Sequence, residues 1–521
     1  MNPFVQRHQD DVIGMLNGFD RVRIRGTIRW LASLRGLGSF LASTGVLLKD
    51  FKDYAQSLTG RVRKAITEMA ERLERPNQYL YSSSRRKELI AREIARRDGV
   101  QEGLVCVLRC VEPCFTFRTR RNPEIKQLEL VGFPGKCEHY YSYFLHPRLG
   151  FMHVRVQTWF PFTIHACLNG REWLARQMDA AGIGYRRREN CFMDVQDFDR
   201  AQQLLDQQVR LDWPRLLDDL LALAHPAHQQ LFGPQPLRYY WSIDESEWAT
   251  DILFRSPSAL AALYPRLLHQ GMTTLSSPDV LRFLGHKLPA HGGVNGHFTG
   301  EVVSDLKHRP EGVRIKHQVN RNSIKMYDKQ GSVLRVETTI NDARDIKTYR
   351  AKEGDPNGPK AWRKMRKGVG DVARRARVSQ AANERYLEAL AGGEGGPSLG
   401  ELTDRLCRPR RWHGDRVRGL NPLAPADARL LAAVHRGEFS ITGLRNRDLR
   451  TLLFGADPTD ETERRRRSAA VSRKLRLLRA HGLIRKVPRS HRYLLTRKGR
   501  QIITALLLAQ HADAEKLAHA A

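Results

Sequence analysis

The sequence predicts an α+β multidomain protein, in which mixed sheets with packing helices are followed by a separate C-terminal domain. Segments that alternate apolar and polar residues dominate 104–169 and 311–341, and each group is joined to segments of helical periodicity. The 521 residues are enough for roughly three domains. The stretch "AGGEGGPS", residues 391–398, has the composition of a linker.

The first predicted domain, residues 1–230, combines a basic strand, helical segments and several further strands. "DRVRIRGTIR" alternates apolar residues with arginines, so one face of this strand carries Arg21, Arg23, Arg25 and Arg29. Residues 40–99 have helical periodicity, and β-type runs follow up to Asn169. "NGREWLARQMDAAG" predicts a helix that starts after Asn169 and ends at Gly182.

The second predicted domain, residues 235–390, contains a β-meander and ends in a basic helix. In "NSIKMYDKQGSVLRVETTIN", residues 322–341, the apolar faces of two strands coincide if Lys329-Gln330-Gly331 forms a three-residue hairpin loop. Residues 311–318 repeat the alternation. The outer face of the meander is then predicted to carry Arg314, Lys316, Lys325, Tyr327, Arg335 and Glu337.

This face has two functional interpretations. Tyr327 could attack a DNA phosphodiester, with Arg335 neutralising the phosphate and Glu337 binding Mg²⁺ or Mn²⁺. The string "IKMYDK…LRVETTI" resembles the "YDK…R-x-E" pairing of rolling-circle replication initiators and related relaxases, which implies strand nicking. If the tyrosine is not the nucleophile, Glu337 and Asp328 remain as metal ligands. The alternative is a binding surface in which Arg314, Lys316 and Lys325 contact nucleic acid, or ordinary cross-strand pairing.

The charge of the chain favours an anionic partner. Lys and Arg total 88 against 56 Asp and Glu, a formal charge of +32 with pI near 10.3. Such an excess attracts polyanions, of which nucleic acid is the commonest in a cell, and we expect DNA rather than RNA. No apolar run is long enough to span a membrane and the start lacks a signal-peptide layout, so a cytoplasmic protein is expected. No P-loop is present, which argues against an ATP-driven motor.

The C-terminal domain, residues 399–521, shows the most specific order of elements. Two helices after Pro425 are followed by the acidic loop "ADPTDETE", a long basic helix, two short strands around residues 488–491, and a last helix. This order predicts a winged helix. From Arg464 to Arg500 there are fifteen Lys or Arg and no Asp or Glu. The residues predicted to bind nucleic acid here are Arg464, Arg465, Arg466, Arg467, Arg473, Lys474, Arg476, Arg489 and Arg492.

The segment "LRAHGLIRKVPRSHRYLLTRKGR" carries a family resemblance. Residues 425–510 resemble the winged-helix domains of bacterial transcriptional regulators of the MarR and ArsR type. The resemblance implies that Arg473, Lys474 and Arg476 address the major groove or its phosphates, and that Arg489 and Arg492 reach the backbone or minor groove. The arginine run 464–467 departs from that family pattern.

The cysteines present a possible metal site whose ligands the sequence does not define. Cys106, Cys110 and Cys114 are spaced by four, and Cys137 and His139 follow. Positions four apart on a strand are about 13 Å apart, too far to share one metal ion unless Pro113 breaks the strand, so buried and reduced cysteines are favoured.

The predicted function is nucleic-acid binding, principally of DNA through the winged helix, and the protein is expected to be encoded by a mobile element. One alternative is a strand-nicking replication initiator or transposase that uses a tyrosine nucleophile. A second is an RNA-binding protein that holds a structured RNA.

Overall fold

The computed structural model describes residues 2–232, 237–286, 300–309, 312–352, 354–355, 357–393, 399–436, 439, 443–488 and 490–510. The chain divides into two compact units. The first comprises Met1–Leu268 and Ser276–Leu390, and the second comprises His269–Leu275 and Ala391–Ala521. Within the described ranges, none of the helices has the length and apolar character that crossing a membrane requires.

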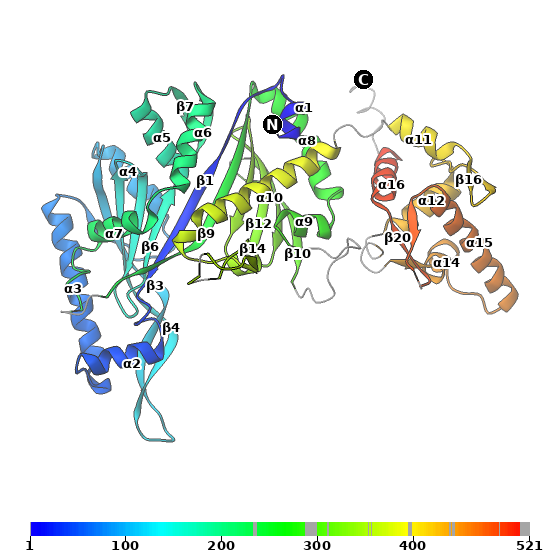
Figure 1. Cartoon of the computed structure of the whole chain (residues 1–521). Coiled ribbons are helices and arrows are strands. Elements are labelled where there is room, and N and C mark those ends of the chain that lie inside the picture. Colours follow the sequence, from blue (N-terminus) through cyan, green and yellow to red (C-terminus); the bar gives the residue numbers. More distant parts are fainter. Residues whose placement is uncertain are drawn as a thin grey trace. The chain divides into compact units, whose positions relative to one another are not determined.

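Residues up to 393 form an α+β structure (Figure 1). Its helices are α1 (Pro3–Arg7), α2 (Leu34–Ser43), η1 (Leu48–Asp50), α3 (Phe51–Arg72), α4 (Lys87–Arg97), α5 (Gly170–Ala181), α6 (Phe198–Val209), α7 (Trp213–Ala224), α8 (Pro257–Thr273), α9 (Ser277–Phe283), η2 (Ala343–Asp345), η3 (Val369–Asp371) and α10 (Val372–Gly393). Its strands are β1 (Val12–Thr27), β2 (Asn77–Tyr79), β3 (Gly103–Arg121), β4 (Leu128–His146), β5 (Gly150–Gln157), β6 (Ile164–Asn169), β7 (Tyr185–Arg188), β8 (Cys191–Val195), β9 (Tyr240–Phe254), β10 (Val302–Arg309), β11 (Gly312–Val319), β12 (Asn322–Lys329), β13 (Val333–Ile340), β14 (Lys347–Arg350) and β15 (Ala361–Lys364).

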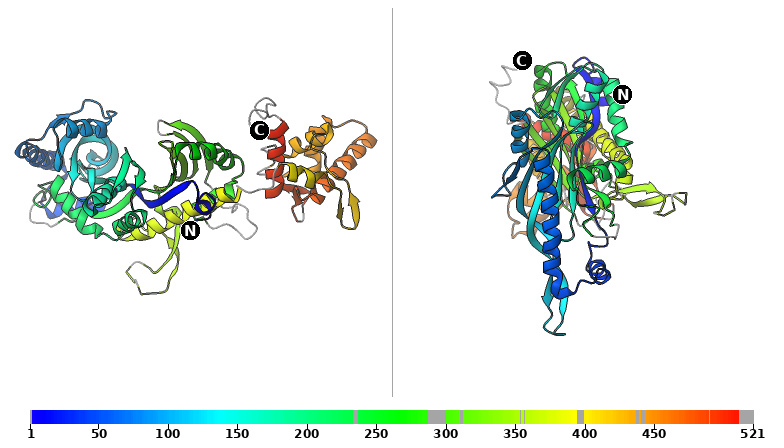
Figure 2. Two further views of the ribbon diagram at one scale, coloured as in Figure 1. Left: turned by 90° about the horizontal axis from the view of Figure 1, so that it is seen from above. Right: turned by 90° about the vertical axis from the view of Figure 1, so that its left-hand side faces the viewer.

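One large sheet organises this unit. Among the described residues it has eleven strands in the order β10-β11-β12-β13-β9-β1-β6-β5-β4-β3-β2. Strand β1, the blue strand of Figure 2, lies near the middle of the sheet and pairs antiparallel with β9 on one side and β6 on the other. The ranges 1–230 and 235–390, which the sequence pattern predicts as two domains, therefore contribute strands to the same sheet.

Helix α10 packs against β9 and β13 of the large sheet, and Figure 1 shows it lying across β9. Its Arg375 is buried and donates hydrogen bonds to Ser246 Oγ, Ile243 O and Ile340 O. Its Asn383 donates to Trp248 O and Val336 O. These bonds connect the helix to strands 35 or more residues away in sequence and hold it against β9 and β13.

The β12–β13 hairpin confirms the predicted alternation and corrects the predicted loop by one residue. Lys325 pairs with Glu337 and Tyr327 pairs with Arg335, so these four side chains share one face of the sheet. The loop has three residues, as predicted, but it begins at Gln330, because Lys329 still pairs with Val333. Gln330 and Gly331 both adopt positive φ, at 57° and 79°.

The second unit contains a smaller core built mainly by helices and a three-stranded sheet. Its elements are α11 (Leu399–Cys407), β16 (Arg410–Trp412), β17 (Asp415–Val417), α12 (Pro425–Val434), β18 (Leu444–Arg445), α14 (Asn446–Phe454), α15 (Glu461–Ala480), β19 (Ile484–Lys486), β20 (Arg492–Leu495) and α16 (Arg497–Gln510). The sheet order is β18-β20-β19, so β20 pairs with both other strands. Val471, Leu475 and Leu478 of α15 are buried in the core, which confirms the apolar stripe expected from their spacing.

Candidate functional site

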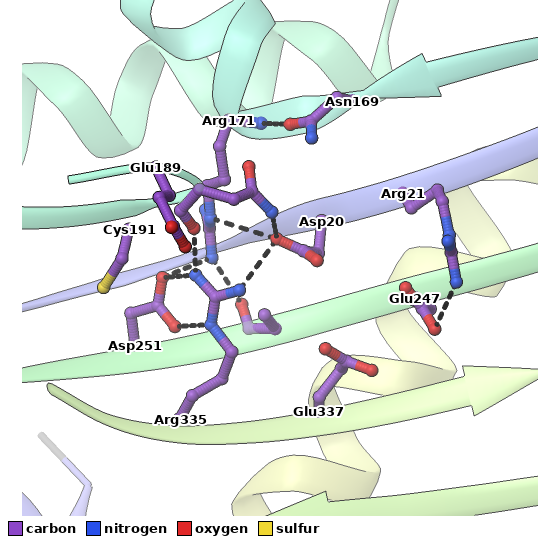
Figure 3. A network of polar contacts seen from close by, with 12 residues as sticks. Asp20, Arg21, Asn169, Arg171, Glu189, Cys191, Glu247, Asp251, Arg335 and Glu337 are labelled. Atoms are coloured by element: carbon purple, nitrogen blue, oxygen red, sulfur yellow. Dashed lines mark hydrogen bonds and ion pairs between the residues drawn. The ribbon is translucent and has the colours of Figure 1, made fainter. Parts of the chain in front are cut away.

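A buried network of charged side chains lies at the centre of the large sheet (Figure 3). Arg335 of β13 is fully buried and makes a two-pronged contact with Asp251 of β9, through Nε at 2.5 Å and Nη2 at 2.8 Å. It also donates to Asp20 Oδ1 at 2.9 Å and to Asn190 O at 3.0 Å. Bidentate contacts of this kind fix the guanidinium plane as well as its charge.

The partners of Arg335 come from elements that are distant in sequence. Asp20 lies at an irregularity in β1, where the register with β9 shifts between Phe19 and Arg21. Asn190 lies in the turn between β7 and β8. A second buried arginine, Arg171, lies in the first turn of α5. Its Nη2 atom is 2.9 Å from Oδ2 of Asp251.

The position of helix α5 is set by its N-cap residue, Asn169, and by close packing of its first residue against β1. The Asn169 side chain accepts hydrogen bonds from the backbone N–H groups of Arg171 and Glu172, at 2.8 and 3.0 Å. Gly182 ends the helix with φ of 65°, so both predicted boundaries are confirmed. A Cβ on Gly170 would lie 1.8 Å from Phe19 O, so only glycine lets the helix approach β1 this closely.

Three carboxylates meet beside this arginine pair. Oxygen atoms of Asp20, Glu247 and Glu337 all lie within 4.8 Å of one another, and all three residues are buried. Lys325 Nζ contacts Glu337 at 2.7 Å and Glu247 at 3.2 Å, and Arg21 contacts Glu247 at 3.0 Å. Burial, reinforced by the neighbouring Glu337, raises the pKa of Glu247 to about 7. Despite its burial, Asp20 keeps a pKa below the ordinary value because Arg335 and Arg171 stabilise its charged form.

The charges of the network balance when every group is ionised. The acids are Asp20, Glu247, Asp251 and Glu337, and the bases are Arg21, Arg171, Lys325 and Arg335. Three carboxylates at this spacing could supply oxygen ligands to Mg²⁺ or Mn²⁺. Since the cations already neutralise them, a bound metal ion would have to displace Lys325 or Arg21. The observed contacts therefore tie β1, β9, β12, β13 and α5 together electrostatically.

The prediction that this face of the hairpin points outward is wrong. Tyr327 is only 7% exposed, Arg335 is fully buried and Glu337 is 2% exposed. The Tyr327 hydroxyl donates a hydrogen bond to Glu337 Oε2 at 2.9 Å. Burial and the neighbouring Glu337 charge raise the pKa of Tyr327 well above the ordinary value for tyrosine. The three residues predicted as catalytic are thus brought together, but in a position that is closed to solvent.

The outer strands of the meander are more open. Arg314 and Lys316 of β11 are partly buried, and Arg314 lies 3.8 Å from Asp305 of β10. Burial and the neighbouring Lys325 lower the pKa of Lys316 below the ordinary value. On β1, the side chains of Arg21, Arg23 and Arg25 are about half exposed, and each is paired with an acid of β9.

Along the basic helix α15, the residues predicted to contact nucleic acid differ in whether they form ion pairs with acids of the chain. Glu461 and Glu463, expected in the loop, form the first turn of α15, and Asp460 caps it. Each glutamate pairs with two members of the arginine run: Arg464 and Arg465 contact Glu461, and Arg466 and Arg467 contact Glu463. The run is therefore compensated in part by acids that lie immediately before it.

The second half of α15 differs residue by residue. Arg476 forms an ion pair with Asp415 of the β16–β17 hairpin, and its guanidinium lies 5.9 Å from the Trp412 ring centroid. Arg473 is exposed and has no ion pair or hydrogen bond with another described residue. Lys474 is half-buried, and Arg492 is exposed at the start of β20. Arg489, predicted to act from the wing, lies outside the described residues.

The cysteines of β3 fall into two environments. Cys106 and Cys110 are buried, and burial raises their pKa values to about 12 and about 11. Cys114 is half-buried, and its Sγ lies 3.3 Å from Sγ of Cys137 on β4. A hydrogen bond between the two thiols lowers the pKa of Cys114 and raises that of Cys137. Burial lowers the pKa of the adjacent His139 to about 3, so its ring is neutral at pH 7.

Sequence reasoning missed three acids and one arginine that complete the central network. Asp20, Glu247, Asp251 and Arg171 carried no predicted role. The available signal was a charged residue inside an otherwise apolar strand or helix segment, as in "NGFDRV" and "EWATDILF". Comparison with known proteins gives no further guide, because no family model, curated protein or solved structure matches the chain.

Proposed function

We propose that the chain is a nucleic-acid-binding protein that contacts duplex DNA through residues 425–510, folded as a winged helix. Three helices, α12, α14 and α15, are followed by the β19–β20 hairpin and α16, and β18 between the first two helices completes the small sheet. In such domains the third helix enters the major groove and the hairpin follows the backbone. Helix α15 and the β19–β20 hairpin would have these two roles.

The exposed Arg473 is the observation that carries the proposal. An arginine in the middle of α15, opposite the buried Val471–Leu475–Leu478 stripe, has no counterion among the described residues. Asn446 at the start of α14 donates to Ser472 Oγ at 2.9 Å and to Ser468 O at 3.0 Å, which fixes α14 against this part of α15. A phosphate or a base edge would satisfy the guanidinium.

The charge of the segment supports an anionic partner. Residues 425–510 contain 20 Lys or Arg and 7 Asp or Glu, a net charge of +13. Glu461 and Glu463 compensate the arginine run in part, whereas Arg473 and the exposed hairpin residues Arg485 and Lys486 have no ion pair with another described residue. We therefore propose the middle of α15 and the hairpin as the contact surface, rather than residues 464–467.

Binding of duplex DNA and of a folded RNA hairpin of equal charge, measured by fluorescence anisotropy with the full chain, tests this proposal. We expect tighter binding of the duplex, and weaker binding after Arg473→Ala together with Arg476→Ala, with an unchanged circular dichroism spectrum. Tighter binding of the RNA would favour the RNA-binding alternative. No binding of either ligand at about 50 mM salt would exclude both.

Strand nicking is a second candidate, favoured by the position of the Tyr327 hydroxyl. It donates to Glu337, which could accept the proton as the tyrosine oxygen bonds to phosphorus and the leaving 3′ oxygen departs. Asp20, Glu247 and Glu337 would hold Mg²⁺ or Mn²⁺. The burial of Tyr327 requires that the sheet face open before DNA reaches it.

Incubation with supercoiled DNA and Mn²⁺ tests the nicking candidate. Nicking would leave a protein–DNA adduct that survives denaturant and disappears in Tyr327→Phe. An adduct that persists in that variant would exclude this tyrosine.

A further inference from the structure

A cluster of soft metal ligands lies on the β3–β4 hairpin, away from the carboxylate network. Cross-strand pairing places Glu112 opposite Cys137, Cys114 opposite Gly135, and Cys110 opposite His139. All these β3 and β4 positions therefore share one face of the sheet. Sulfur atoms of Cys114 and Cys137 and a ring nitrogen of His139 lie within 4.8 Å of one another.

We propose that Cys114, Cys137 and His139 bind a thiophilic divalent cation, of which Zn²⁺ is the natural choice. Zinc is bound by thiolates at about 2.3 Å and by imidazole at about 2.0–2.1 Å. In a tetrahedral site these bond lengths place two sulfur ligands about 3.8 Å apart. The observed Sγ–Sγ distance of 3.3 Å is half an ångström from that value, whereas a disulfide bond requires about 2.05 Å.

The chemistry of the donors also fits this ion. Two thiolates and a neutral imidazole give Zn²⁺ a set with no net charge, which suits a partly buried position. The neighbouring Glu112 is not needed as a ligand, since it is held by Lys87 at 2.9 Å, by Arg155 at 3.1 Å and by the Tyr141 hydroxyl at 2.6 Å. Three protein ligands leave the fourth position of the metal for water or a ligand.

The site has a definite place in the fold. It lies where β3 and β4 continue past their neighbours into the long hairpin that projects at the bottom of Figure 1. The pairing of β4 with β5 ends at His139, which lies opposite Gln157. Cys114 pairs with Gly135 of β4, past the end of that pairing. A metal ion would therefore join the projecting part of the hairpin to the main sheet.

Titration of the full chain with Co²⁺ in the presence of a phosphine reductant tests the proposal. We expect one Co²⁺ per chain with a thiolate-to-cobalt charge-transfer band, and Zn²⁺ should displace it. Cys114→Ser and Cys137→Ser should each lose the band. Cys407→Ser should retain it, because Cys407 is an exposed cysteine of the second unit. His139→Asn should weaken cobalt binding while leaving a thiolate band.

An alkylation measurement on the wild-type chain tests the proposal without relying on variants that could misfold. With Zn²⁺ present, Cys114 and Cys137 should be protected from iodoacetamide, and peptide mass spectrometry should show the protection lost after chelation. Absence of the cobalt band in the wild-type chain would overturn the proposal. Equal alkylation with and without Zn²⁺, or a Cys114–Cys137 disulfide that forms in air while metal uptake fails under reductant, would also overturn it.

Discussion

Replacement of Arg335 by methionine should strongly destabilise the first unit. Arg335 is fully buried and makes four hydrogen bonds, two with Asp251, one with Asp20 and one with Asn190 O. Methionine retains an apolar stem of similar length. It leaves the buried carboxylates of Asp20 and Asp251 with one positive charge fewer beside them. Breaking a buried ion pair by removing one partner typically costs about 3–5 kcal/mol. Arg171 still contacts Asp251 at 2.9 Å, which places our expectation at the lower end, about 3 kcal/mol.

The free energy of unfolding of the two proteins can be compared by urea denaturation followed by tryptophan fluorescence. Hydrogen exchange of the β9 and β13 amides should accelerate in the same variant, since the network joins these strands. Arg23→Met is the matched control, because Arg23 is 46% exposed in its side chain and pairs with Glu245 at 3.3 Å. An exposed pair of this kind contributes about 0–1 kcal/mol. A loss for Arg335→Met no larger than that of the control would refute the account of the network.

Two further predictions concern the carboxylates and the boundary between the units. Because the pKa of Glu247 is raised from 4.5 to about 7 in the folded chain, its protonated form favours folding below pH 4.5, and this contribution is lost as the pH rises to about 7. As the pH rises from 4.5 to about 7, the free energy of unfolding of the wild type should therefore fall relative to that of Glu247→Gln. A difference that does not depend on pH would show that Glu247 titrates normally. Limited proteolysis should cut first within residues 391–398, where four Gly and one Pro occur; first cuts elsewhere in the chain would contradict this prediction.

The sequence pattern predicted local structure more reliably than it predicted which residues are buried. Alternation placed Tyr327, Arg335 and Glu337 on one face correctly, because the period of a strand is a local property. It could not show that this face is covered. The groups that cover it, Asp20 and Arg171, come from β1 and α5, more than 150 residues earlier in the chain.

The cysteines show the same limit at shorter range. Spacing along β3 predicted that Cys106, Cys110 and Cys114 lie too far apart to share one metal ion. The partner of Cys114 is Cys137 on the neighbouring strand, and only the register of β3 with β4 brings the two together. Similarly, the acids before the arginine run were expected in a loop, although helix α15 begins at Glu461 and aligns them with arginines three and four residues later.

The salt dependence of DNA binding tests the central claim most directly. For the full chain and a duplex, the logarithm of the association constant should fall linearly with the logarithm of salt concentration, with a slope of about −0.9 per phosphate contact. Arg473→Ala should reduce the magnitude of that slope by about one unit. Arg408→Ala should leave it unchanged, because Arg408 is an exposed arginine of the same unit that pairs with Asp404 at 2.7 Å. Equal slopes for wild type and Arg473→Ala, or binding that does not depend on salt, would contradict a DNA contact at the middle of α15.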